Sequence, residues 1–397
     1  MIDNRIYTII NQLVNDAARK KQRNIVPEIY NDIPTKPPIK ILRGLRGIGK
    51  TTSLLQLTKI YGEKEKSFYL SADWPQIRRS TLYEYAVELI EKGFKMLFID
   101  EIHTYPEWEN EIKAIVDQFP VIKLLVSGSA PVVFRGDRRE KIYEWGPMSF
   151  SEYLHLKDDI KIESDEEWKS IDKSTSLIAP YYPDIEGWFS DYLKIGGFPF
   201  SLEYSYDDSI ETIYTVIKQS IEKDAATILK LSSQKIMAME RLLYFVATSS
   251  PGELSINSLS KNLGVSKIIV DEIIDALEQM KILRSLKPDA SGASLIRGEP
   301  KILFSHPNLR FSICEKLGVK PEIGSIREEL VLFGLEQRGY KIFTVKGFKK
   351  NPDYVIKKNN TSTVIEIGGA GKTGAQLKGF QDSIVIKGNQ LISLLLI

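Results

Sequence analysis

The stretch "GLRGIGKT", residues 44–51, follows the short apolar run "IKIL" and decides the fold of this chain. Four of its residues fit the pattern G-x-x-x-x-G-K-[ST]. Glycines let backbone N–H groups wrap around phosphate oxygens, and the N-terminus of the following helix adds a partial positive charge. The spacing therefore predicts a strand, a phosphate-binding loop and a helix in direct succession.

The polar side chains of this loop have separate expected roles. Lys50 would reach the β- and γ-phosphates of a nucleoside triphosphate, and Thr51 would ligate Mg²⁺. We therefore expect ATP and Mg²⁺ to be the bound groups. The predicted nucleotide-binding residues of the stretch are Gly44, Arg46, Gly47, Gly49, Lys50, Thr51 and Thr52.

Apolar strands and helices alternate after the loop. Strands are expected at "SFYLSA", "KMLFID" and "IKLLVSGS", with helices between them. Such an alternation is typical of a parallel sheet that helices cover on both faces. The predicted fold class is therefore α/β, with a P-loop NTPase core built on a parallel sheet.

Two carboxylates end the buried strand in "KMLFIDEIH", residues 95–103. Asp100 can hold Mg²⁺ through water, and the adjacent Glu101 is well placed to polarise the attacking water. At the end of the next strand, Ser127 or Ser129 could contact the γ-phosphate, or both could be small polar residues of a tight turn. His103 is expected at the surface or supporting its neighbours, and not as a ligand.

Composition narrows the class of protein. The 397 residues are 43% hydrophobic and 27% charged, which is ordinary for a globular chain of several domains. No apolar run approaches the roughly 20 residues that span a bilayer, and the N-terminus lacks the layout of a secretory signal. A single cysteine excludes an intrachain disulfide, so we expect a reducing, cytoplasmic setting. The net charge of +2 gives no global attraction to nucleic acid.

The alternation of strands and helices stops near residue 150. A mostly helical stretch follows, and then three helices with two strands, which resemble a winged-helix module. The cations Arg19, Lys20, Lys21 and Arg23 are expected at the end of the N-terminal helix, where the helix dipole favours them. The predicted parts are an N-terminal helix and entry segment (1–38), the P-loop core (39–150), a helical lid (151–230), a winged helix (231–312) and a C-terminal α/β domain (313–397).

Several stretches together resemble one family, the archaeal and bacterial AAA-type ATPases with a winged helix and a C-terminal nuclease-like domain, which are related to the signalling ATPases called STAND. The matching stretches are "GLRGIGKTT", "FIDEIHTYPEWENEIKAI", "VSGSA", "PMSFSEYL" and "YLKIGGFP". The resemblance implies that Pro199 lies against the adenine; the alternative is a helix-breaking turn. It also implies that Arg139 senses or stabilises γ-phosphate charge, in cis or from a neighbouring subunit, with Arg135 and Arg138 as competitors.

The C-terminal part resembles the restriction-endonuclease-like fold. A catalytic version uses an acid on the first helix, an acid on a strand and Glu-x-Lys on the next strand. Glu328, Asp353 and Glu366 match the acids, but Gly368 stands where the lysine belongs. Lys372, on the turn "GGAGKTG", could take its place; otherwise the domain is a degenerate nuclease fold kept as an interaction module.

Two segments bear on nucleic-acid binding. The third helix of the winged-helix module carries Asp271, Glu272, Asp275 and Glu278, which a duplex would repel, so this module could dock against protein instead. The lysine-rich stretch 341–358 has aromatic residues interleaved. It could follow a phosphate backbone, or its lysines could protect an edge strand.

The sequence therefore predicts an ATP-binding, Mg²⁺-dependent ATPase, with Glu101, Lys50 and Arg139 as its catalytic residues. It would act as a nucleotide-driven switch or regulator together with a partner, either double-stranded DNA or a protein, and a homo-oligomer is possible. Two alternatives stay open: an ATP-gated nuclease effector, and an ATP-stabilised scaffold with negligible turnover. Glu101 favours hydrolysis over the scaffold, and Gly368 speaks against the nuclease.

Overall fold

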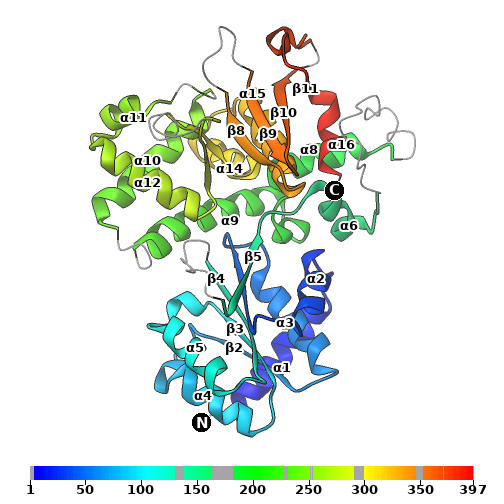
Figure 1. The fold of residues 1–397 in the computed structure, drawn as a ribbon, viewed down its shortest axis with the longest axis vertical. Helices are drawn as coiled ribbons and strands as arrows, with labels where there is room; N and C mark the ends of the chain where they lie inside the picture. The colour runs from blue at the N-terminus through cyan, green and yellow to red at the C-terminus, as the bar shows by residue number, and fades with distance from the viewer. Residues whose placement is uncertain are drawn as a thin grey trace. The chain divides into compact units, whose positions relative to one another are not determined.

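The chain forms two compact units, Met1–Gly146 and Pro147–Ile397, in a computed structural model (Figure 1). The structure describes residues 4–129, 138–162, 182–226, 231–250, 252, 254–289, 299–345, 352–369 and 371–396.

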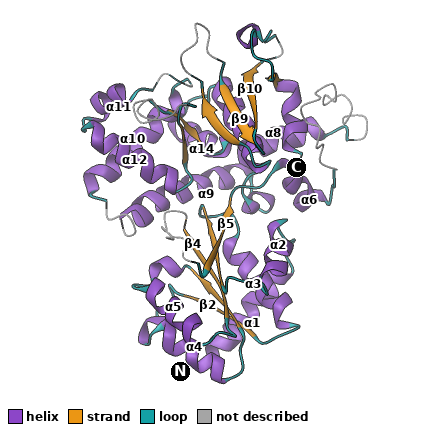
Figure 2. Cartoon of the chain, viewed as in Figure 1, coloured by secondary structure: helices purple, strands orange, loops and turns teal. Residues whose placement is uncertain are grey.

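A five-stranded parallel sheet forms the centre of the first unit (Figure 2). Its strand order is β2-β3-β4-β1-β5. Its strands are β1 (Ile39–Gly44), β2 (Ser67–Ser71), β3 (Met96–Asp100), β4 (Lys123–Ser129) and β5 (Glu140–Trp145). Every residue of β3 is buried, as expected for a strand covered on both faces. Because all strands are parallel, their carboxyl ends meet at one edge, and β1 leads into the glycine-rich loop there. The predicted α/β class is confirmed.

Helices cover both faces of this sheet: α1 (Asn4–Ala18), α2 (Ile25–Asp32), α3 (Lys50–Gly62), α4 (Leu82–Glu91) and α5 (Trp108–Gln118), with short 3₁₀ turns η1 (Ile77–Arg79) and η2 (Ile102–Thr104). From β1 the chain crosses the sheet to β2 at its edge. It then moves back toward β1, from β2 to β3 and from β3 to β4. Right-handed crossovers therefore place α3 on one face and α4 and α5 on the opposite face, as Figure 1 shows.

The N-terminal segment differs from the prediction. The first helix ends at Ala18, and a second helix, α2, which the sequence did not indicate, begins at Ile25, before the prolines of the entry segment. The amide of Gln56 on α3 donates to the carbonyls of Ala17 (3.1 Å) and Lys20 (3.0 Å). Residues 4–38 therefore belong to the same compact unit as the P-loop core.

The second unit begins with helices α6 (Phe150–Asp158), α8 (Ile185–Ile195) and α9 (Tyr206–Gln219), with a 3₁₀ turn η3 (Pro199–Leu202) and a π-helical turn η4 (Ser220–Ala225). Three helices follow, α10 (Ser233–Thr248), α11 (Ile256–Leu263) and α12 (Lys267–Gln279), and then an antiparallel pair, β6 (Leu283–Leu286) and β7 (Lys301–Phe304). This is the element order predicted for residues 231–312. The winged-helix assignment itself stays a prediction.

The C-terminal part has a four-stranded sheet in the order β11-β10-β9-β8. Its elements are α14 (Pro307–Leu317), α15 (Ile323–Gln337), β8 (Lys341–Thr344), β9 (Tyr354–Lys358), β10 (Thr361–Gly368), η5 (Ala375–Leu377), β11 (Ser383–Lys387), η6 (Gly388–Gln390) and α16 (Leu391–Leu395). Strand β10 pairs in parallel with β11 and antiparallel with β9, which pairs antiparallel with β8. Apolar side chains from α6, α8, α15, α16 and this sheet share one core, which joins the helical and sheet parts.

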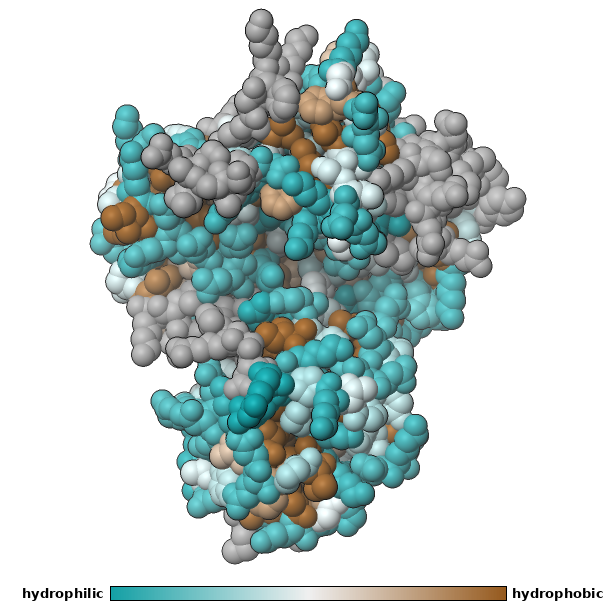
Figure 3. All heavy atoms as spheres, in the orientation of Figure 1, coloured by the Kyte–Doolittle hydropathy of each residue, from teal (hydrophilic) through white to brown (hydrophobic). Residues whose placement is uncertain are grey.

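The face drawn in Figure 3 is mainly hydrophilic, with apolar side chains gathered on part of the first unit. Among the residues that the structure describes, no helix has both the length and the apolar character needed to cross a membrane.

Candidate functional site

The loop between β1 and α3 requires its glycines. A Cβ on Gly44 would collide with the carbonyl oxygen of Trp145 on the neighbouring strand β5 and with the side chain of Ile48. Gly47 and Gly49 have φ angles of 76° and 93°, a region that side chains with a Cβ rarely enter. The sequence pattern therefore corresponds to a tight backbone loop directly before the N-terminus of α3, as predicted.

Lys50 lies inside this loop. Its Nζ donates to the carbonyl oxygens of Gly44 (2.9 Å) and Leu45 (2.8 Å), and the side chain is buried. The loop itself thus keeps the ammonium group at the place where the pattern requires a cation. Arg46 and Thr52 are half-buried at either side of it.

The Asp100 carboxylate, at the carboxyl edge of the sheet, accepts hydrogen bonds from four residues. Its Oδ2 accepts hydrogen bonds from the hydroxyls of Thr51 (2.5 Å) and Tyr69 (3.1 Å). Its Oδ1 accepts from the Ser127 hydroxyl and from the backbone N–H of Glu101 (3.0 Å). The structure therefore brings Ser127 together with Thr51 and Asp100, the two residues that the sequence assigned to Mg²⁺.

Tyr69 is a site residue that the sequence reasoning missed. It lies on β2, and burial together with the charge of Asp100 raises the pKa of its hydroxyl. The tyrosine thus stays protonated and donates to the carboxylate. Its position in the apolar strand "SFYLSA" gave no sign of this contact, because the pairing of β2 with β3 creates it.

The oxygens of Thr51 and Asp100 fit a hard cation such as Mg²⁺, which prefers hydroxyl, carboxylate and phosphate oxygens. Within the described ranges, no group of three or more His, Cys, Asp or Glu side chains could hold a metal by itself. A Mg²⁺ ion at Thr51 and Asp100 would therefore draw its other ligands from nucleotide phosphates and water, as this ion commonly does.

Glu101 leaves β3 with a left-handed backbone, φ 50°. Its Oε2 lies 3.3 Å from Nε2 of His103. The backbone N–H of Ser129 donates to Nδ1 of the same ring (3.2 Å), so Nε2 is the nitrogen that carries the proton toward the Glu101 carboxylate. His103 therefore supports its neighbours, one of the two expected roles, and Ser127 and Ser129 contact different partners.

Arg139 does not lie at this edge. Its backbone carbonyl accepts a hydrogen bond from the N–H of Ile39, the first residue of β1, while the loop follows the last residue of that strand. Its guanidinium forms a bidentate pair with Asp117 on α5 (2.8 and 3.0 Å). Six strand residues span roughly 20 Å, so the prediction that Arg139 acts in cis on the γ-phosphate is corrected. A role from a neighbouring subunit stays a prediction, and Arg135 lies outside the described residues.

Pro199 begins the turn η3 in the second unit. The "GG" before it is explained by close packing within that unit: a Cβ on Gly197 would lie 2.7 Å from Cε1 of His306, and the Gly197 N–H donates to Oδ1 of Asn308 (2.7 Å). The proposed contact of Pro199 with adenine would involve the other unit and stays a prediction.

The acids that the sequence singled out in the C-terminal part contact different partners. Asp353 accepts a hydrogen bond from the N–H of Ile367 (2.7 Å). Glu328 on α15 pairs with Lys301 of β7 (2.6 Å) and accepts from the Tyr354 hydroxyl.

Lys372 occupies the space that a side chain at position 368 would fill. A Cβ on Gly368 would lie 2.6 Å from Cγ of Lys372, and the Lys372 ammonium lies 2.6 Å from Oε1 of the buried Glu366. Burial and the charge of Asp353 raise the pKa of Glu366, against the effect of Lys372. Lys372 thus contacts Glu366 from four residues beyond Gly368, and its part in a nuclease site stays a prediction.

The lysine-rich stretch is partly engaged in contacts of its own. Lys357 pairs with Asp289 (2.7 Å), and Lys358 donates to the carbonyl of Arg338 (2.7 Å). Lys346, Lys349 and Lys350 lie outside the described residues. On the acidic helix α12, Glu272 pairs with Lys235 of α10. Neither segment thus presents all of its charges to a partner.

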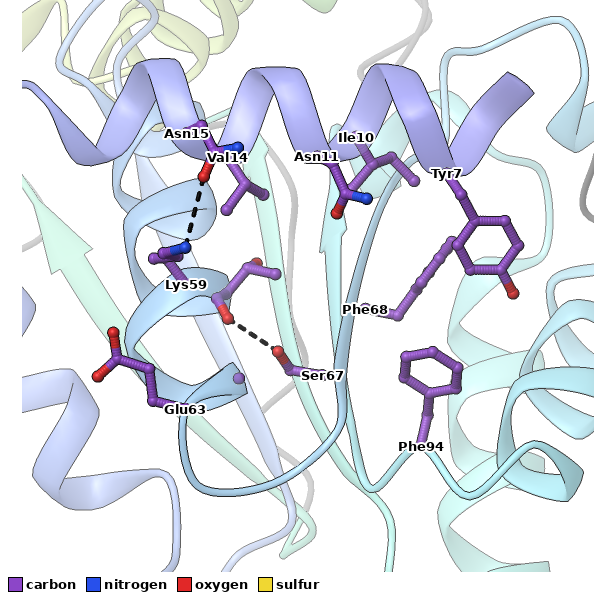
Figure 4. Close-up of a pocket in the computed structure, with 12 residues that line it drawn as sticks. Tyr7, Ile10, Asn11, Val14, Asn15, Lys59, Glu63, Ser67, Phe68 and Phe94 are labelled. Atoms are coloured by element: carbon purple, nitrogen blue, oxygen red, sulfur yellow. Dashed lines mark hydrogen bonds between the residues drawn. The ribbon is translucent and has the colours of Figure 1, made fainter. Parts of the chain in front are cut away.

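A hollow in the first unit, with a volume of about 370 Å³, lies away from the loop (Figure 4). Tyr7, Phe68 and Phe94 line one end, and Asn15, which accepts from Lys59 (3.4 Å), lies at the other. None of the residues predicted to bind nucleotide lines it. The hollow is therefore separate from the candidate site.

Comparison with known proteins gives two partial family matches. Residues 36–154 match an AAA domain, and residues 186–319 match a domain of unknown function, DUF8612. The uncharacterized protein MJ1637 of Methanocaldococcus jannaschii is 28% identical over 382 residues, which cover 88% of this chain and 78% of that protein.

Among solved structures, the chain aligns with a RuvB structure from Thermotoga maritima at 15% identity and a TM-score of 0.34, over 76% of this chain and 96% of the other. It aligns with the STAND protein PH0952 of Pyrococcus horikoshii at 12% identity and 0.29, over 79% and 45%. Scores this low do not indicate a common overall fold. The AAA-domain match over residues 36–154 includes the glycine loop, Asp100 and Glu101.

Proposed function

We propose that this chain is an ATP-binding, Mg²⁺-dependent ATPase that works as a nucleotide-driven switch. The observation that carries the proposal is the contact of Thr51 with Asp100, directly beside a glycine loop that holds Lys50. This arrangement places a cation, a hydroxyl and a buried carboxylate around the N-terminus of one helix. Those are the groups that phosphoryl transfer from a nucleotide requires.

Each residue of the site would have a role that follows from its position. Backbone N–H groups of residues 45–51 and the N-terminus of α3 would bind the phosphates, and Lys50 would neutralise their charge. Mg²⁺, when bound by Thr51 and Asp100, supplies further neutralisation of the transferring phosphoryl group. Glu101 would accept a hydrogen bond from the attacking water, with His103 fixing the direction of its carboxylate.

Steady-state ATP hydrolysis by the full chain tests this function. The rate is measured with Mg²⁺ and with EDTA, each with and without double-stranded DNA at moderate salt. We expect Mg²⁺-dependent turnover. Stimulation by DNA would identify the DNA as the partner, whereas turnover independent of DNA would favour a protein partner or a second copy of the chain. ATP binding without measurable turnover would instead support the scaffold.

A nuclease that ATP gates is the second candidate, and the place of Lys372 favours it. Lys372 reaches Glu366 from across Gly368, which restores a lysine beside the acid where the motif had lost it. The test is Mg²⁺-dependent nicking of supercoiled plasmid by the full chain with ATP. Lys372→Ala should abolish nicking, while Lys261→Ala, an exposed lysine of α11, should leave it unchanged. A wild-type chain that leaves the plasmid intact would exclude this candidate.

A further inference from the structure

Arg23 lies between α1 and α2 and is buried beside the glycine loop. Its Nη1 donates to two backbone carbonyls, that of Ile48 in the loop (2.9 Å) and that of Gly146 (3.0 Å). The guanidinium also lies 5.0 Å from the centre of the Trp145 ring. One side chain thus connects the loop to the last two residues of the first unit.

The contact with Ile48 fixes the orientation of a peptide group. In a planar trans peptide, the C=O and the following N–H point in opposite directions. Because the Ile48 carbonyl points to Arg23, the N–H of Gly49 points away from it. Glycines with left-handed backbones stand on both sides of Ile48, and glycine backbones rotate readily, so this peptide has a second orientation available once its tether is removed.

The contact with Gly146 lies where the chain passes to the second unit, which begins at Pro147. Met148, the second residue of that unit, has both of its backbone polar groups hydrogen-bonded. The Met148 N–H donates to the Gly197 carbonyl (2.8 Å), and the Met148 carbonyl accepts from the Tyr192 hydroxyl (2.9 Å). Gly197 in turn donates to Asn308 of α14. A change in the position of the Gly146 carbonyl therefore occurs only two residues before the hydrogen-bonded backbone of Met148.

We propose that Arg23 is a positioning residue that aims the Gly49 N–H at the bound phosphates and links that peptide to the connection at Trp145–Gly146. Nucleotide binding would then change the constraint on Met148 and Gly197 in the second unit. The element with two states is the Ile48–Gly49 peptide, which the phosphates bias directly and which Gly146 biases through Arg23. This inference rests on the proposed ATPase function and names its regulation.

Hydrogen exchange of the full chain tests it, at the amides of Met148 and Gly197, with and without the ATP analogue AMPPCP and Mg²⁺. Calorimetry measures AMPPCP affinity in the same samples. In the wild type we expect AMPPCP to change both exchange rates at least threefold. Arg23→Met should bind AMPPCP about tenfold more weakly and show no change in exchange at saturation. Arg19→Met, an exposed arginine on the same segment, is the matched control and should behave as the wild type.

The outcomes distinguish a failure of the ATPase proposal from a failure of the proposed role of Arg23. A wild type that does not bind AMPPCP removes the ATPase proposal and this inference with it. A wild type that binds while Arg23→Met keeps its affinity and the exchange response removes the role of Arg23 alone. If Arg23→Met does not fold, Arg23→Gln replaces it: the shorter amide cannot reach both carbonyls, so a retained exchange response overturns the proposal and a lost one supports it.

Discussion

The hydroxyl of Thr51 lies 2.5 Å from Oδ2 of Asp100, so the first turn of α3 and the last residue of β3 share one polar contact. Asp100→Asn keeps the size of the side chain but removes its charge. Because the carboxylate is the charged ligand available to Mg²⁺ here, we expect Mg²⁺-dependent ATP turnover to fall by roughly a hundredfold or more. Affinity for ATP in EDTA should stay within a few-fold. Asp16→Asn, on the exposed face of α1, is the control and should change neither value.

Lys50→Ala should abolish ATP binding. The ammonium group lies inside the loop, and its removal leaves phosphate charge without its nearest cation. Calorimetric titration with ATP and Mg²⁺ measures the effect, which we expect to exceed roughly a hundredfold in affinity. Lys59→Ala changes the same residue type near the other end of α3 and should bind as the wild type does. Equal affinities of the two variants would show that nucleotide does not bind at this loop.

Glu101→Gln should bind ATP normally but hydrolyse it poorly. The amide keeps the shape of the side chain, but it cannot accept a proton from water, so kcat should fall by about 10²–10⁴. Binding and single-turnover hydrolysis are measured separately, with Glu91→Gln of α4 as an exposed control. If Glu101→Gln turns over at the wild-type rate, another group activates the water.

His306 should make the stability of the second unit depend on pH. Burial, with the nearby charge of Arg284, lowers the pKa of His306 to about 3, whereas an unfolded histidine titrates near 6.5. The unfolded chain therefore takes up the proton first. The stabilisation is complete above about pH 6.5 and is lost as the pH falls toward 3.

Urea unfolding at pH 7.5 and pH 5 measures this loss, which should be on the order of a few kcal/mol. His306→Asn keeps a capping side chain at the start of α14, where His306 accepts from the Asn308 N–H, but has no proton to gain. We expect the variant to be less stable at pH 7.5 yet to lose less stability between the two pH values. An equal loss in both proteins would assign the pH dependence to other groups.

Much of the fold followed from local sequence patterns. The alternation of apolar strands and helices predicted β1 to β4 and the parallel sheet, because strands covered on both faces must be apolar along their length. Helix α2 was missed because the prolines around residues 34–38 dominated the interpretation of that segment. Its helical residues pack Val26 and Ile29 into the first unit, a tertiary contact with no local signature.

The site was predicted in part, because some of its residues also form a local sequence pattern. The loop glycines, Lys50, Thr51 and Asp100 carry their chemistry in a fixed spacing, so a single sequence reveals them. The role of Arg139 in cis was wrong because the sequence does not state at which end of a strand a flanking residue lies. That follows from the pairing of β5 with β1. The role of Arg139 from a neighbouring subunit stays a prediction.

The sequence by itself determined the phosphate loop, the carboxylates after β3 and the α/β class, because these depend on residue types at short, fixed spacings. The tertiary structure decided which distant groups meet them. Tyr69 reaches Asp100 only because β2 pairs with β3, and Arg23 reaches Ile48 only because the N-terminal helices pack on α3. Lys372 reaches Glu366 only because it packs against Gly368 at the end of β10. Contacts between residues far apart in sequence arise from packing, and local patterns do not encode them.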